Sequence, residues 1–319
     1  MPSPATRPDT PLELPCARVG AAARRRVISV SPEVADWGLL ILPGLIWGAS
    51  FLFIAEGLVA LGPNGVTFTR IAVGLATLSC VPASRRPVAR EDWPRIALLA
   101  IVWFALPLSM FPFAEREVST AVTGMLNGAV PLFAAAFAAV IARRLPSREV
   151  GLGLGVGFLG AVLVALPGLG ADAGTGRGVL LIVCALVSYG LAVNLARPLQ
   201  QRNGALPVIW RALGLALLLT APLGLPDLLD ARWSTRPLLA MLALGAFGTG
   251  IANVLVTVAA GRLGATRASA STFLIPVVAL VLGVVFRREH VAPLSVVGGG
   301  VCLAGAWMLR MAALRTRAS

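Results

Sequence analysis

Long apolar runs, separated by short polar or turn-forming segments, fill most of the chain. Each run holds about 18 to 24 residues, enough for an α-helix to cross a hydrocarbon layer about 30 Å thick. Proline, glycine and arginine punctuate the runs and mark the helix ends. The pattern predicts ten membrane-spanning helices, at residues 37–60, 64–82, 95–114, 119–141, 150–168, 178–197, 207–225, 237–260, 267–286 and 293–311.

The composition agrees with an all-α integral membrane protein. Hydrophobic residues make up 57% of the chain and charged residues 13%, whereas soluble globular proteins carry about 25% charge. The connections between runs leave no room for a soluble domain. Residues 1–36 are rich in Pro, Ala and Arg but contain no apolar stretch typical of a signal peptide, so they are expected to form a disordered tail. Residues 312–319 are expected to form a second, C-terminal tail.

The positive charge lies in the connections rather than on one exposed face. All 27 basic residues are arginine, and the formal net charge is +13. The absence of lysine excludes a P-loop lysine and any Schiff-base lysine. With the N-terminus inside the cell, nineteen arginines fall on the cytoplasmic side and six on the other, as the positive-inside rule requires. We therefore expect a multi-pass protein of the cell (inner) membrane, with both termini cytoplasmic, a lipid bilayer as its partner and no bound nucleic acid.

Candidate catalytic and metal-binding residues are scarce. The chain has one histidine, His290, and four cysteines, Cys16, Cys80, Cys184 and Cys302, with no metal-ligand spacing. Residues 155–160 match the nucleotide-binding motif GxGxxG, but they lie inside an apolar run with no strand before it. We therefore interpret these glycines as a helix-packing face. We expect no catalytic residues, no metal and no cofactor, and hence no enzyme.

The chain contains an internal duplication. The segment from Pro131 aligns without gaps with the segment from Pro276, an offset of 145 residues that also pairs Arg143 with Arg288. The same offset pairs glycines 153, 155 and 160 with glycines 298, 300 and 305. Trp47 matches Tyr189 at an offset of 142 residues, and Arg70 matches Arg211 at an offset of 141. Each copy, residues 37–168 and 178–311, then holds five helices, and an odd number inverts the second copy in the membrane. The sequence predicts ten transmembrane helices built as two inverted five-helix repeats.

These residues resemble the drug/metabolite transporter superfamily, specifically its EamA-type ten-helix branch. The resemblance covers residues about 40–311 and rests on IWGASF at 46–51, FTR at 68–70, Pro131, Pro276 and Arg288-Glu289 before a glycine-rich last run. It departs at residues 145–148, where the first copy lacks a counterpart of Glu289, and at Tyr189, where a Trp would complete the symmetry. The resemblance implies a secondary carrier, often an exporter of amino acids, metabolites or drugs, with a cavity between the halves.

Three charged residues lie inside predicted spans, away from the first and last residues of the span, and are candidates for coupling or charge pairing. Glu56 is a candidate for proton coupling, and interfacial placement is its alternative. Arg70 and Arg211 are candidate anion-binding groups, although either could instead reach the interface by snorkelling. Glu56 and Arg70 flank the same turn and could pair, which would weaken the coupling hypothesis because an adjacent arginine favours the charged carboxylate.

Neutral polar and aromatic side chains near mid-span are candidates for binding a substrate. Their alternative role is to hold helices together through hydrogen bonds. The candidates are Trp47, Ser50, Asn127, Tyr189, Asn194, Asn253 and Thr272.

We therefore expect a secondary transporter that exports a small metabolite, amino acid or drug by alternating access, with proton exchange as a candidate driving force. A lipid flippase and a membrane-embedded enzyme acting on lipid-linked substrates remain alternatives, and the oligomeric state is expected to be a monomer or a homodimer.

Overall fold

The computed structural model describes residues 32–143, 145–169, 173–263 and 268–318. Helices account for nearly all of this part of the chain, and no strand occurs in it. The first repeat contains α1 (Pro32–Gly57), α2 (Pro63–Ser79), α3 (Trp93–Leu99), η3 (Ala100–Ala105), α4 (Leu106–Ala114), α5 (Thr120–Asn127), α6 (Val130–Ala142) and α7 (Arg148–Leu169). The second contains α8 (Ala173–Asn203), α9 (Ala205–Leu229), α10 (Thr235–Ala243), η4 (Leu244–Ile251), α11 (Ala252–Leu263), η5 (Ser269–Phe273), α13 (Leu274–Arg287) and α14 (Pro293–Ala318). Two short 3-10 turns, η1 (Pro82–Arg85) and η2 (Arg90–Asp92), join α2 to α3.

Helical segments occupy all ten predicted positions. Among the described residues, eight helices are long and apolar enough to cross a membrane, and they fill eight of these positions. The other two positions hold α2, with 17 residues, and the shorter apolar helix Ser271–Arg287. Four of the ten spans are composite: π-helix η3 joins α3 to α4, π-helix η4 joins α10 to α11, a break at Gly128 separates α5 from α6, and 3-10 helix η5 precedes α13.

The predicted tails differ from the structure at their boundaries. Most of the expected N-terminal tail, 1–36, lies outside the described residues, but residues 32–36 already belong to α1. The expected C-terminal tail, 312–319, continues α14 as far as Ala318. Pro32 stands at the first position of α1, where its missing N–H interrupts no helical hydrogen bond, and no other proline occurs in either segment, so both helices extend past their apolar runs.

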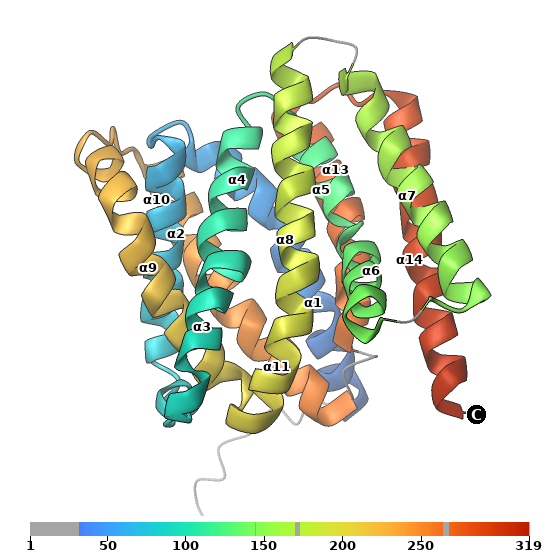
Figure 1. Ribbon diagram of the computed structural model, residues 1–319. Helices are drawn as coiled ribbons and strands as arrows, with labels where there is room; N and C mark the ends of the chain where they lie inside the picture. The colour runs from blue at the N-terminus through green and yellow to red at the C-terminus, as the bar shows by residue number, and fades with distance from the viewer. Residues whose placement is uncertain (1–31, 144, 170–172, 264–267, 319) are drawn as a thin grey trace, which may run out of the picture.

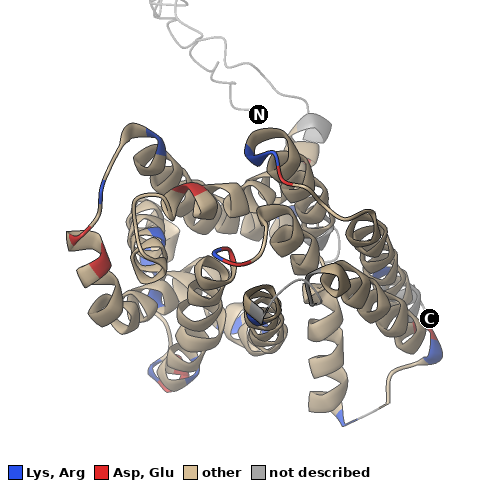
Figure 2. Cartoon of the chain, turned by 90° about the horizontal axis from the view of Figure 1, so that it is seen from above, with Lys and Arg blue, Asp and Glu red and all other residues tan. Residues whose placement is uncertain are grey.

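The two ends of the described chain lie on the same side of the bundle. In Figure 1, α1 begins and α14 ends at the lower side, while α8, the repeat counterpart of α1, runs in the opposite direction. Figure 2 shows that acidic and basic residues gather mainly in connections and at helix ends. We call the lower side the terminal face and the other side the opposite face. This arrangement is that of a two-repeat helical membrane protein.

Helix contacts repeat between the two halves. α1 packs on α13, and its counterpart α8 packs on α6; α2 packs on η4, and its counterpart α9 packs on η3. The pairs α2–α9 and α7–α14 join counterparts directly. Even local backbone geometry is duplicated, because Arg143 and Arg288 end their helices with φ of 50° and 54°. The duplication seen in the sequence is therefore a structural one.

Candidate functional site

A cavity of about 210 Å³ lies between the two halves. Its wall is mostly aromatic and aliphatic, with a few polar groups, as in small-molecule sites generally. The lining residues are Trp47, Ser50, Phe51, Arg70, Trp103, Phe104, Leu108, Phe111, Asn127, Val130, Tyr189, Val193, Gly248, Thr249, Asn253, Thr272 and Ile275.

Repeat-related positions face this cavity together. Asn127 and Thr272, 145 residues apart, both line it, as do Val130 and Ile275 at the same offset. Both pairs flank the first turns of α6 and α13, where Pro131 and Pro276 cannot donate a backbone hydrogen bond. The cavity therefore lies on the axis that relates the two repeats.

The π-helices η3 and η4 contribute a second matched part of the wall. Trp47 Nε1 donates a hydrogen bond to the Gly248 carbonyl of η4 at 3.0 Å. Ser188 Oγ donates to the Val102 carbonyl of η3 at 2.7 Å. A π-helical turn misaligns backbone carbonyls, and here a side chain from the first helix of each repeat satisfies one of them. Trp47 is thereby held in place at the cavity wall.

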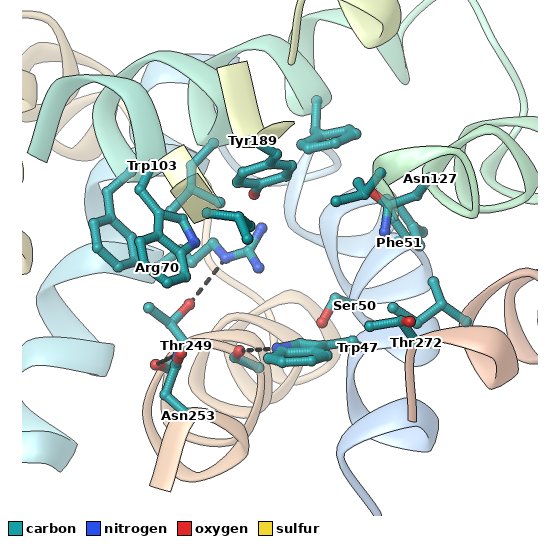
Figure 3. Close-up of a pocket in the computed structure, with 17 residues that line it drawn as sticks. Trp47, Ser50, Phe51, Arg70, Trp103, Asn127, Tyr189, Thr249, Asn253 and Thr272 are labelled. Carbon is teal, nitrogen blue, oxygen red and sulfur yellow. Dashed lines mark hydrogen bonds between the residues drawn. The ribbon is translucent and has the colours of Figure 1, made fainter. Parts of the chain in front are cut away.

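Arg70 places a positive charge in the cavity. The side chain is 7% exposed, and its Nε donates to Thr249 Oγ1 at 3.0 Å. Figure 3 shows the guanidinium between Tyr189 and Thr249, close to Trp103. Among the lining residues, Arg70 carries the single formal charge. It is therefore the group most suited to bind an anion.

The neutral polar side chains of the cavity differ in whether they already have hydrogen-bond partners. Asn253 Nδ2 donates to the Thr249 carbonyl at 2.7 Å, and Ser50 Oγ donates to the Ile46 carbonyl at 3.0 Å. By contrast, Asn127 Oδ1 is buried and accepts no hydrogen bond from the described residues. An unpaired buried acceptor is costly, and Asn127 Oδ1 therefore has an unused capacity to accept a hydrogen bond.

The structure brings six of the seven predicted substrate-binding candidates together at the cavity wall: Trp47, Ser50, Asn127, Tyr189, Asn253 and Thr272. Asn194 lies elsewhere, because its Nδ2 donates to the carbonyls of Ala134 and Gly190, both at 2.9 Å. Its contacts join α8 to α6, the helix-joining role considered as its alternative. Substrate binding by the other six stays a prediction.

Arg211 does not share the position of its repeat counterpart Arg70. Its guanidinium donates to the Pro207 carbonyl on its own helix at 3.1 Å and lies 5.4 Å from the Trp210 ring. It is absent from the cavity wall. The two arginines therefore differ chemically although the repeat relates them.

Glu56 is buried, with 6% exposure, but its partner is not Arg70. Its carboxylate bonds to Arg236 Nε at 2.7 Å and to Arg287 Nη1 at 3.3 Å. These contacts join α1, α10 and α13 at the opposite face. The pairing of Glu56 with Arg70 considered from the sequence is therefore wrong, because Arg70 turns inward to Thr249.

Glu115 was missed in the sequence analysis because it lies one residue beyond the predicted span. Both of its carboxylate oxygens are buried and accept no hydrogen bond from the described residues. Burial and the nearby Glu289 raise the pKa of the Glu115 carboxyl well above its ordinary value, and Arg70 and Arg287 act in the opposite direction. Its spacing from Leu108 and Phe111, on one helical face, is the signal that points to it.

Within the described residues, His, Cys, Asp and Glu side chains form no group of three or more that could hold a metal ion.

Comparison with known proteins identifies relatives along most of the chain. A "probable terminal-alkyne amino-acid exporter" of Streptantibioticus cattleyicolor is 29% identical over 89% of this chain and 95% of its own length. An uncharacterized transporter of Archaeoglobus fulgidus is 22% identical over 86% of this chain and 98% of its own length. A solved structure titled only "Crystal structure of protein" matches with a TM-score of 0.58 and 20% identity, covering 90% of this chain and 99% of that one. That last likeness concerns the fold alone.

The model of the EamA-like transporter family matches residues 37–166 and again residues 176–311. The two matches together span more than half of the chain and correspond to its two repeats. The chain belongs to the EamA-like transporter family, within the drug/metabolite transporter superfamily.

Proposed function

We propose that this transporter exports a small amphipathic molecule that bears a carboxylate, of the amino-acid type. The observation that carries the proposal is the cavity between the repeats, which combines one buried cation, Arg70, with an unpaired amide oxygen, Asn127. A carboxylate suits Arg70, an ammonium group suits Asn127 Oδ1, and the apolar part of such a molecule suits the aromatic wall.

The size of the cavity and one relative support this substrate class. A volume of about 210 Å³ is below the range of about 300–1,000 Å³ that drug-sized ligands occupy. The Streptantibioticus relative is named as an exporter of a terminal-alkyne amino acid. Its name also motivates the direction of transport.

Alternating access is the mechanism that the repeats favour. Ion pairs join helices of the two halves at both faces: Glu56 with Arg236 at the opposite face, and Asp36 with Arg262 at 2.8 Å at the terminal face. Rocking one half against the other would open one set while the other stays closed. We further propose that the terminal face is cytoplasmic and the membrane is the cell membrane, on the basis of the arginine bias. Reporter fusions at the two termini would test the orientation, and an external location of either would contradict it.

The flux of amino acids into proteoliposomes tests the substrate class. The panel includes L-propargylglycine, a simple terminal-alkyne amino acid, and compares wild type with Arg70→Gln and Arg211→Gln. The repeat makes Arg211 the matched control, because it lies outside the cavity wall. A hydrogen bond to a charged group contributes about 1.5–3 kcal/mol, so Arg70→Gln should weaken transport about 10- to 150-fold.

Two outcomes would contradict the proposal. Equal flux in Arg70→Gln and wild type would remove Arg70 from substrate binding. The absence of flux for every amino acid in the panel would favour a lipid substrate instead.

A further inference from the structure

Glu115 lies directly beyond the wall of the cavity. It is the first residue after α4, and its backbone N–H donates to the Phe111 carbonyl at 2.9 Å. Leu108, Phe111 and Glu115 follow each other at helical spacing on one face, and the first two line the cavity. Phe111 also stacks on Tyr189, with ring centroids 5.9 Å apart. The carboxyl group is therefore separated from the cavity by about one helical turn.

The carboxylates near Glu115 already have partners, whereas Glu115 has none among the described residues. Glu56 binds Arg236 and Arg287. Glu289 accepts the backbone N–H groups of Thr120 and Ala121, both at 2.9 Å, at the start of α5.

Glu117, two residues after Glu115, pairs with Arg177. An ionised carboxylate that is buried without partners is strongly disfavoured, so the neutral acid is the favoured form of Glu115.

The charged groups that face Glu115 come from three directions. Glu289, in the connection after α13, repels its negative form; Arg70 on α2 and Arg287 on α13 attract it. Arg287 is shared with Glu56, while Arg70 keeps its charge inside the cavity. Glu115 and the cavity therefore influence each other through Arg70.

We propose that Glu115 is a proton-binding site whose charge is coupled to the cavity through Arg70. When Glu115 loses its proton, its negative charge offsets that of Arg70; when it binds a proton, the field of Arg70 acts fully on the cavity. A carboxylate bound at Arg70 and a proton bound at Glu115 then favour each other, and this coupling is reciprocal. The proton site itself does not depend on the proposed transport function; only the identity of the anion rests on it.

Infrared difference spectroscopy of the purified protein, titrated with acid, tests the proton site without any substrate. The neutral carboxyl of Glu115 should give a carbonyl band that disappears as the pH rises, and Glu115→Gln should lack this band. Glu117→Gln is the matched control in the same turn, and it should keep the band. A band that survives unchanged in Glu115→Gln would overturn the proposal, whatever the outcome of the flux assay.

The coupling through Arg70 has a separate signature. Because Arg70 favours the ionised form of Glu115, Arg70→Gln should move the midpoint of the band to higher pH. Arg70→Lys, which keeps the positive charge, should leave the midpoint near that of wild type and also serves if Arg70→Gln folds poorly. A midpoint in Arg70→Gln equal to that of both wild type and Arg70→Lys would refute the coupling.

Discussion

The contact between α7 and α14 predicts opposite effects for two glycines on the same helix. A Cβ added at Gly160 would lie 2.2 Å from Cys302 N and 2.6 Å from its Cα. A Cβ added at Gly155 would meet nothing within 4 Å. Gly160→Ala should therefore destabilise the protein relative to Gly155→Ala, although both variants gain the same intrinsic helix propensity.

The free-energy cost of Gly160→Ala follows from how far α7 and α14 must move apart to make room for the added Cβ. Ordinary contact begins at 3.4 Å, so the two helices must separate locally by about 1 Å, and a backbone nitrogen cannot rotate away as a side chain can. Overpacking of this kind costs about 1–3 kcal/mol, while Gly→Ala in a helix gains about 1 kcal/mol. The gain is common to both variants, so their difference should be about 1–3 kcal/mol.

Unfolding of the purified variants in mixed detergent micelles would measure this difference as a free energy. The repeat supplies an independent copy of the experiment on α14, because Gly305 would place its Cβ 2.3 Å from Gly157 N whereas Gly300 meets nothing within 4 Å. Equal stability of Gly160→Ala and Gly155→Ala would refute the reasoning, since it would mean that the two helices are not in close contact.

Three further predictions concern the hydrogen bonds and charges around the cavity. Thr249→Val removes the acceptor of Arg70 Nε and should weaken transport by about tenfold or more, whereas Thr249→Ser should retain it, as measured by flux. Glu289→Ala leaves the first N–H groups of α5 unpaired and should lower the free energy of unfolding by about 1–2 kcal/mol in a denaturation assay. Because Glu115 keeps its proton in the folded state at pH values where the unfolded chain loses it, stability should fall as the pH rises above about 4.5. Glu115→Gln should lack this loss, so its thermal stability relative to wild type should increase with pH.

The fold was predictable because two kinds of sequence information agree. The apolar runs fix the number of spans, since each must satisfy its own backbone hydrogen bonds in lipid. The offset of 145 residues that pairs Pro131 with Pro276 then relates one half to the other. The π-helices were not predictable, because η3 is apolar throughout, η4 combines apolar residues with three glycines and Thr249, and neither contains a proline.

The site was predictable only in part. Trp47 and Tyr189 were found because the repeat relates them and because aromatic side chains suit a binding cavity. Arg70 and Arg211 could not be told apart, since the alignment relates their positions but does not fix which neighbour each side chain reaches. Glu115 was not predicted because it follows the apolar run by one residue, and because the charges that act on it, such as Arg70 and Glu289, are distant in sequence.

The paired π-helices also determine where this chain can change in length. A π-helical turn holds one residue more than the α-helical turn that it replaces, so removing one residue from η3 can restore an α-helix and leave the direction of every side chain on α4 unchanged. Removing one residue from α4 before Phe111 has no such compensation and would turn every later residue by about 100° around the helix axis. Phe111 would then leave the cavity wall, and Glu115 would move away from Arg70. A single deletion in α4 should therefore impair flux more than a single deletion at Ile101 in η3. The two π-helices are the places in these spans where the loss of a residue leaves the rest of the helix in position.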